Sequence, residues 1–147
     1  MKKKMLILVS IFTLVLMIGA TSALATSYNS SFIVSTTLTG GTRSYQGGDD
    51  MGINCWGVSL TIPTGYELVD EPAGYKVTLY KGSTSQGTVG TFPIATSTWN
   101  GKWTGKGPGD NTLNYHYNFT AVNTKTTNNE GGSGYASIHG SCTMYSE

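Results

Sequence analysis

The pattern that most restricts the fold is a strict alternation of apolar and polar side chains between Leu113 and Ala121. Leucine, tyrosine, phenylalanine and alanine fill every second position, and asparagine, histidine and threonine fill the positions between them. A period of two is the period of a β-strand, whose successive side chains point to opposite faces. The run therefore predicts a strand with one buried face and one face in water.

The same alternation recurs along the chain between glycine-rich turns, at 32–38, 75–79, 99–103 and 136–144. After residue 25, half of the residues are Gly, Ser, Thr or Asn, which disfavour helix interiors. No segment has the apolar spacing of an amphipathic helix. We predict an all-β protein: a small antiparallel β-sandwich of about seven strands, immunoglobulin-like in strand style, with a small β-barrel as the alternative. The polar segment 124–134 predicts a loop.

The long apolar run Met51–Ile62 changes phase in its middle. Ile53 and Cys55 have odd numbers, whereas the apolar residues after position 57 have even numbers. One extra residue would return both halves to a common face. We therefore predict a β-bulge at Trp56 and Gly57, with the Trp56 side chain directed outward.

Residues 1–25 contain the three parts of a secretory signal in the required order. A tri-lysine start, typical of bacterial signals, precedes the apolar segment Met5–Ile18, and Ala23-Leu24-Ala25 matches the small-x-small cleavage pattern. The apolar segment of about 14 residues is shorter than the roughly 20 that span a bilayer. We expect a helical signal peptide at 1–25 and a single secreted domain at 26–147, without a transmembrane anchor after cleavage.

Removal of the signal also changes the charge of the protein. The signal contains three lysines. Residues 26–147 therefore contain six Lys and Arg residues and eight Asp and Glu residues, which gives a net charge of −2. This balance argues against nucleic acid as a partner, because nucleic-acid binding relies on basic surfaces.

Cys55 and Cys142 are the only cysteines, and both fall on predicted inward faces. A disulfide persists in the oxidising environment that export implies. It would close a loop of about 87 residues and stabilise the fold by ~4–5 kcal/mol. We expect this disulfide, with two buried free thiols as the alternative. Neither cysteine has a neighbour at metal-ligand spacing, so we expect no metal.

The sequence offers little for catalysis. His116 and His139 are the only histidines, each on the outward face of a predicted strand. They would meet only if those strands were neighbours, and a small hydrolase using this pair is one alternative function. No nucleophile, phosphate-binding or dinucleotide-binding motif occurs. We expect no enzyme activity and no cofactor.

The aromatic residues are the strongest candidates for a working surface, because flat rings beside amides and hydroxyls suit both glycan stacking and protein hot spots. Trp99 and Trp103 flank a glycine on one strand face and have core burial as their alternative role. We expect a secreted non-catalytic binding module for a cell-wall glycan or another secreted or surface protein. A toxin or bacteriocin-like protein acting on membranes is the other alternative. The candidate binding residues are Trp56, Tyr80, Trp99, Trp103, His116 and His139.

Overall fold

The computed structural model describes residues 25–94 and 98–147, and these residues form an all-β fold. All of the predicted signal peptide except Ala25 lies outside the described residues. No helix in the described part of the chain is long and apolar enough to cross a membrane. The strands are β1 (Ser27–Val34), β2 (Thr37–Thr39), β3 (Arg43–Gln46), β4 (Met51–Thr61), β5 (Glu67–Leu68), β6 (Gly74–Lys81), β7 (Thr84–Pro93), β8 (Thr98–Trp103), β9 (Thr112–Val122), β10 (Lys125–Thr127), β11 (Ser133–Tyr135) and β12 (Ser137–Ser146).

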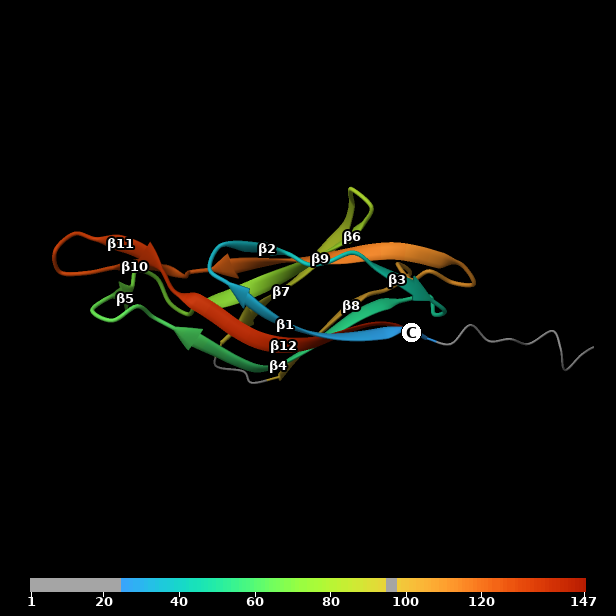
Figure 1. The fold of residues 1–147 in the computed structure, drawn as a ribbon, viewed down its shortest axis with the longest axis horizontal. Coiled ribbons are helices and arrows are strands. Elements are labelled where there is room, and N and C mark those ends of the chain that lie inside the picture. The colour runs from blue at the N-terminus through green and yellow to red at the C-terminus, as the bar shows by residue number, and fades with distance from the viewer. Residues whose placement is uncertain (1–24, 95–97) are drawn as a thin grey trace, which may run out of the picture.

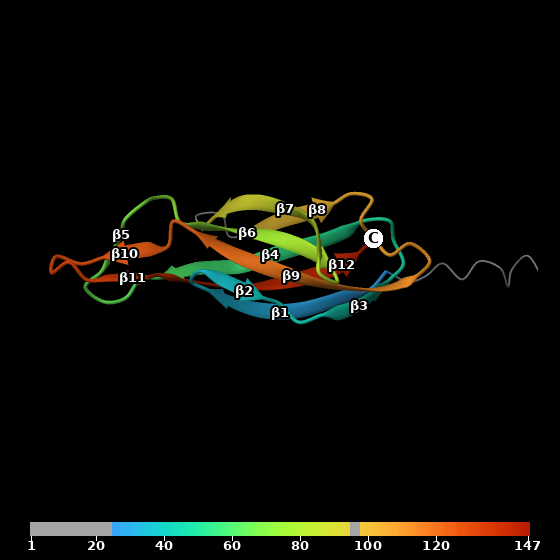
Figure 2. The same cartoon turned by 90° about the horizontal axis from the view of Figure 1, so that it is seen from above.

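Of the three antiparallel sheets in the described residues, the two larger ones lie face to face (Figures 1 and 2), and the smallest has the order β11-β10-β5. One of the two larger sheets has the strand order β1-β12-β4-β8. The other has the order β2-β9-β6-β7, and β3 pairs with β9 beyond the end of β2, so that β2 and β3 together form an interrupted edge. The sheets do not close into a barrel, which confirms the β-sandwich prediction over its alternative. Strand β7, which ends in Pro93, lies at the edge of its sheet, where a residue without a backbone N–H is tolerated.

The core lies between the two sheets and follows the predicted alternation. Strand β9 buries Tyr115, Tyr117 and Phe119, which were the inward positions of the Leu113–Ala121 run. Tyr117 and Phe119 pair with the buried Leu79 and Val77 of β6, and β4 and β12 supply the opposing layer. A buried tyrosine needs a partner for its hydroxyl, and the Tyr117 hydroxyl donates to the Gly52 carbonyl at 3.1 Å.

Two segments differ from the sequence-based expectation. The alternating run 32–38 is not one strand, because the chain leaves β1 after Val34, crosses between the sheets and continues as β2. Both pieces still send apolar side chains into the same core, which is why the alternation did not reveal the crossover. The expected loop 124–134 contains the β10–β11 hairpin. The Asn128 side-chain oxygen organises its turn by accepting from the backbone N–H groups of Glu130 and Gly132 at 3.1 and 2.6 Å.

The predicted bulge is confirmed in β4. His139 pairs with Ser59 and Ser141 pairs with Trp56, so two residues of β4 face a single residue of β12. The inserted Gly57 has φ 61°, a left-handed conformation that glycine adopts without strain. After the bulge, the even-numbered apolar residues of β4 point into the core as expected.

The predicted disulfide is absent, whereas its alternative, two buried free thiols, is present. Cys55 and Cys142 are direct cross-strand partners on β4 and β12. Opposed side chains of an antiparallel pair have Cβ atoms about 4.5–5.5 Å apart, whereas a disulfide needs about 3.8 Å, so adjacency alone does not create a bond. Burial raises the pKa of the Cys55 thiol to about 11 and that of Cys142 to about 12, which keeps both protonated at neutral pH.

Candidate binding face

The outward side of the sheet β1-β12-β4-β8 carries cross-strand rows of polar and aromatic side chains. Residues directly opposite each other in an antiparallel sheet share a face, so the strand register assigns each row. One row runs Ser31, Ser141, Trp56, Thr98, and the next runs Asn29, Thr143, Asn54, Asn100. We refer to these two rows, with Ile33, His139 and Ser59 beyond the first and Tyr145 beyond the second, as the Trp56 face.

Trp56 is the most prominent side chain of this face. It is 40% exposed, although it lies within β4 rather than on a loop. Its register partners, Ser141 and Thr98, are small. The bulge that follows Trp56 allows its ring to point outward while the remainder of β4 fills the core. The exposure expected from the phase change in the sequence is therefore confirmed.

Tyr145 adds a second ring to the Trp56 face. Its ring covers Gly52, its partner on β4, and occupies the space that a Cβ atom at Gly52 would need. The Tyr145 hydroxyl makes a long hydrogen bond of 3.5 Å to Asn54 Oδ1. Burial, with a contribution from the nearby Glu147 charge, raises the pKa of Tyr145 above its usual value. The hydroxyl is therefore a neutral donor on this face.

Between the two rings lies a row of amides and hydroxyls. Thr143 donates from its hydroxyl to Asn29 Oδ1 at 2.6 Å, which orients that amide. Asn54 and Asn100 continue the row across β4 and β8. Each asparagine presents two N–H donors and one carbonyl acceptor, so the row can both donate to and accept from hydroxyl groups of a ligand.

Near one end of this face, one ammonium group bridges two carboxylates. The Lys102 ammonium lies 2.8 Å from an Asp50 oxygen and 2.7 Å from a Glu147 oxygen. The hydrogen bond from Lys102, with a second from the Gly105 backbone N–H, holds the pKa of Asp50 below its usual value. The same two carboxylates raise the pKa of Lys102. The Trp56 face itself therefore carries polar groups rather than unpaired charge.

The remaining predicted residues do not gather at this face. Tyr80 and His116 stack on the outer side of the other sheet, with ring centroids 5.0 Å apart and planes 5° from parallel. Trp103 is 5% exposed and donates from its indole N–H to the Gly87 carbonyl at 2.9 Å. Trp99 packs on Phe92 with centroids 4.4 Å apart. Core burial, the alternative role of these two tryptophans, is thus observed for Trp103, whereas Trp99 is partly buried against the core.

The two histidines are not brought together. His139 points outward from β12 and His116 points outward from β9, which belong to different sheets. Packed sheets are about 10 Å apart, and these side chains project away from each other, so they share neither a proton nor a ligand. Among the described residues, no three His, Cys, Asp or Glu side chains are placed to hold a metal ion. The hydrolase alternative therefore loses the pair on which it depended.

Sequence reasoning missed Tyr145 and the asparagine row. The alternation of β12 was traced only as far as Met144, and one further step places Tyr145 on the outward side. Asn29, Asn54 and Asn100 come from three strands far apart in the sequence, and no local pattern links them. Comparison of the chain with protein-family models, with curated proteins and with solved structures found no match.

Proposed function

We propose that the protein is a secreted, non-catalytic binding protein whose Trp56 face binds a neutral glycan of the cell wall. The observation that carries this proposal is the exposed Trp56 ring, flanked by small residues and next to a row of three asparagines. An exposed indole offers its face to the apolar C–H side of a sugar ring, and amides match the sugar hydroxyls as donors and acceptors. The export signal at 1–25 supports an extracellular site of action.

A glycan fits this face better than the other polymers that meet a secreted protein. The centres of protein–protein interfaces are more apolar than the rest of the surface, whereas serine, threonine and asparagine surround Trp56. Nucleic acid requires basic groups for its phosphates, and Lys102 at the end of the face is already bonded to two carboxylates.

The experiment is a pull-down of residues 26–147 on insoluble cellulose, chitin, xylan and purified peptidoglycan. We expect retention on at least one of them and at least a tenfold loss of affinity in Trp56→Ala. Tyr80→Ala is the matched control, because it removes an aromatic residue from the opposite outer face. Retention on none of these materials would overturn the proposal. So would unchanged binding by Trp56→Ala with loss in Tyr80→Ala, because that result would move the site to the other sheet.

A further inference from the structure

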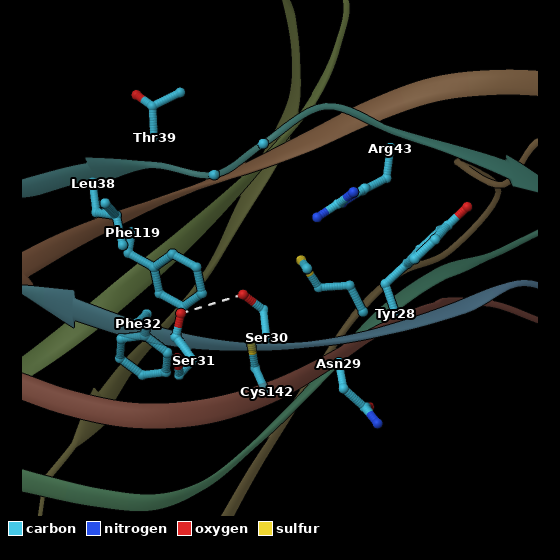
Figure 3. A pocket seen from close by; sticks show the side chains of 13 residues that line it. Tyr28, Asn29, Ser30, Ser31, Phe32, Leu38, Thr39, Arg43, Phe119 and Cys142 are labelled. Carbon is cyan, nitrogen blue, oxygen red and sulfur yellow. Dashed lines mark hydrogen bonds between the residues drawn. The ribbon is translucent and has the colours of Figure 1, made fainter.

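A closed-ended cleft opens between the free edges of the two sheets, along β1 on one side and β2 and β3 on the other (Figure 3). Its volume is about 230 Å³. An apolar cavity of about 150 Å³ holds a benzene ring, so this cleft has room for one aromatic ring with a short substituent. It faces the inward side of β1, and Asn29 and Ser31 of the Trp56 face contribute to its lining.

Both ends of the cleft are closed by the protein itself. At one end the chain crosses from β1 to β2 through Ser35 and Thr36. At the other end the Tyr28 hydroxyl donates to the Ser44 carbonyl at 2.7 Å and bridges the two sheets. An extended peptide that added a strand to β1 would have to pass through this bridge. The cleft therefore suits a small molecule.

One end of the cleft is apolar and aromatic. Phe32, Phe119 and Leu38 lie together there in Figure 3. The rings of Phe32 and Phe119 stack with centroids 4.4 Å apart and planes 19° from parallel. Met144 lines the cleft nearer its other end, because it pairs with Tyr28 across β1 and β12. The apolar end offers an aromatic guest contacts with the two phenylalanine rings and with Leu38.

The opposite end carries one positive charge. Arg43 and Tyr28 lie side by side there, with the guanidinium carbon 5.7 Å from the Tyr28 ring centroid. No Asp or Glu lines the cleft. Within residues 25–94 and 98–147, both ion pairs involve Lys102, so Arg43 has no carboxylate partner there. A guanidinium is the side chain best suited to bind a carboxylate through two parallel hydrogen bonds.

We propose that this cleft binds a small aromatic carboxylate, with its carboxylate on Arg43 and its ring against Phe32 and Phe119. The length of β1 between Tyr28 and Phe32 is about 13 Å at ~3.3 Å per residue, which accommodates a single ring and a short acid side chain. The site can be tested separately from the proposed glycan function, because the groups that would hold the ligand, Arg43, Phe32 and Phe119, lie outside the Trp56 face.

The test is calorimetric titration of residues 26–147 with phenylacetate and with phenylacetamide, its uncharged counterpart. We expect phenylacetate to bind at least tenfold more tightly than the amide. Arg43→Gln should abolish that difference, and Lys106→Gln, which removes a surface cation outside the cleft, should preserve it. Ser30→Leu should abolish binding of both compounds by filling the cleft, whereas Ser133→Leu on β11 should not.

Three results would overturn the proposal: no heat of binding at millimolar phenylacetate, equal affinity for acid and amide in the unmodified protein, or unchanged selectivity in Arg43→Gln. The first two comparisons use the unmodified protein, so a variant that fails to fold cannot obscure the answer. Trp56→Ala should retain phenylacetate binding. The cleft and the glycan proposal can therefore fail separately.

Discussion

Gly57, the residue inserted at the bulge of β4, allows a quantitative test of the register. Its φ is 61°, and a Cβ atom built there would meet nothing within 4 Å. Gly57→Ala therefore adds no steric overlap, and its cost comes from the left-handed backbone alone, about 1–2 kcal/mol for a residue with a Cβ atom. Alanine also lowers the conformational entropy of the unfolded chain, which offsets about 0.4–1 kcal/mol of this cost. The net loss of stability should be about 1 kcal/mol.

Gly41 provides the matched control. A Cβ atom there also meets nothing within 4 Å, but its φ lies outside the left-handed region. Gly41→Ala should therefore be neutral or stabilising by up to about 1 kcal/mol. The two variants should differ by about 1–2 kcal/mol in the free energy of unfolding, measured by urea denaturation followed by tryptophan fluorescence. In a domain of this size the difference corresponds to about 4–8 °C between their melting temperatures.

Equal stability of the two alanine variants would refute this reasoning. It would mean that residue 57 does not adopt a left-handed conformation in solution and that β4 passes the site as a regular strand. If β4 were a regular strand without the extra residue, every side chain of β4 after residue 57 would point to the opposite face of the sheet. The assignment of Trp56 and Ser59 to one face would then fail as well.

Two further predictions concern the reactivity of the thiols and the loss of stability at acidic pH. Cys55 and Cys142 are buried free thiols with raised pKa values, so iodoacetamide should leave the native protein unmodified. After unfolding without reductant, iodoacetamide should add two groups to the protein. No modification in denaturant would show that the two cysteines are oxidised. Because the pKa of Asp50 is lowered by folding, its contribution to stability is present above its ordinary value of 3.8 and is lost as the pH falls through the lower folded value. Asp50→Asn should therefore lose less stability than the unmodified protein between pH 4 and pH 2 in urea denaturation, and equal losses would contradict the pairing with Lys102.

Local alternation was sufficient to predict the sheet class and the core. The run from Leu113 to Ala121 has period two, and its inward positions supply three of the buried aromatic residues. The phase change after Cys55 located the bulge, because a strand with one buried face cannot change parity without an extra residue. These features depend on neighbours along the chain, and the sequence displays them directly.

Spacing along the chain could not predict which strands pair. Tyr80 and His116 are stacked because β6 and β9 are neighbours, whereas His139 lies on the other sheet. All three have the same outward character in the sequence. Trp99 and Trp103 had two possible roles for the same reason: alternation places both on one side of β8 but does not say whether that side meets the core.

The sequence by itself determined that this chain forms amphipathic strands and where one of them bulges, and it predicts an export signal before them. Only the tertiary structure decided that β12 lies between β1 and β4, which assembles the asparagine row beside Trp56 and sets the two thiols opposite each other. It also decided that β1 and β2 part to leave a cleft in front of Arg43. The physical reason is that alternation specifies a face of each strand, whereas sites are made by register and packing between strands that are distant in sequence.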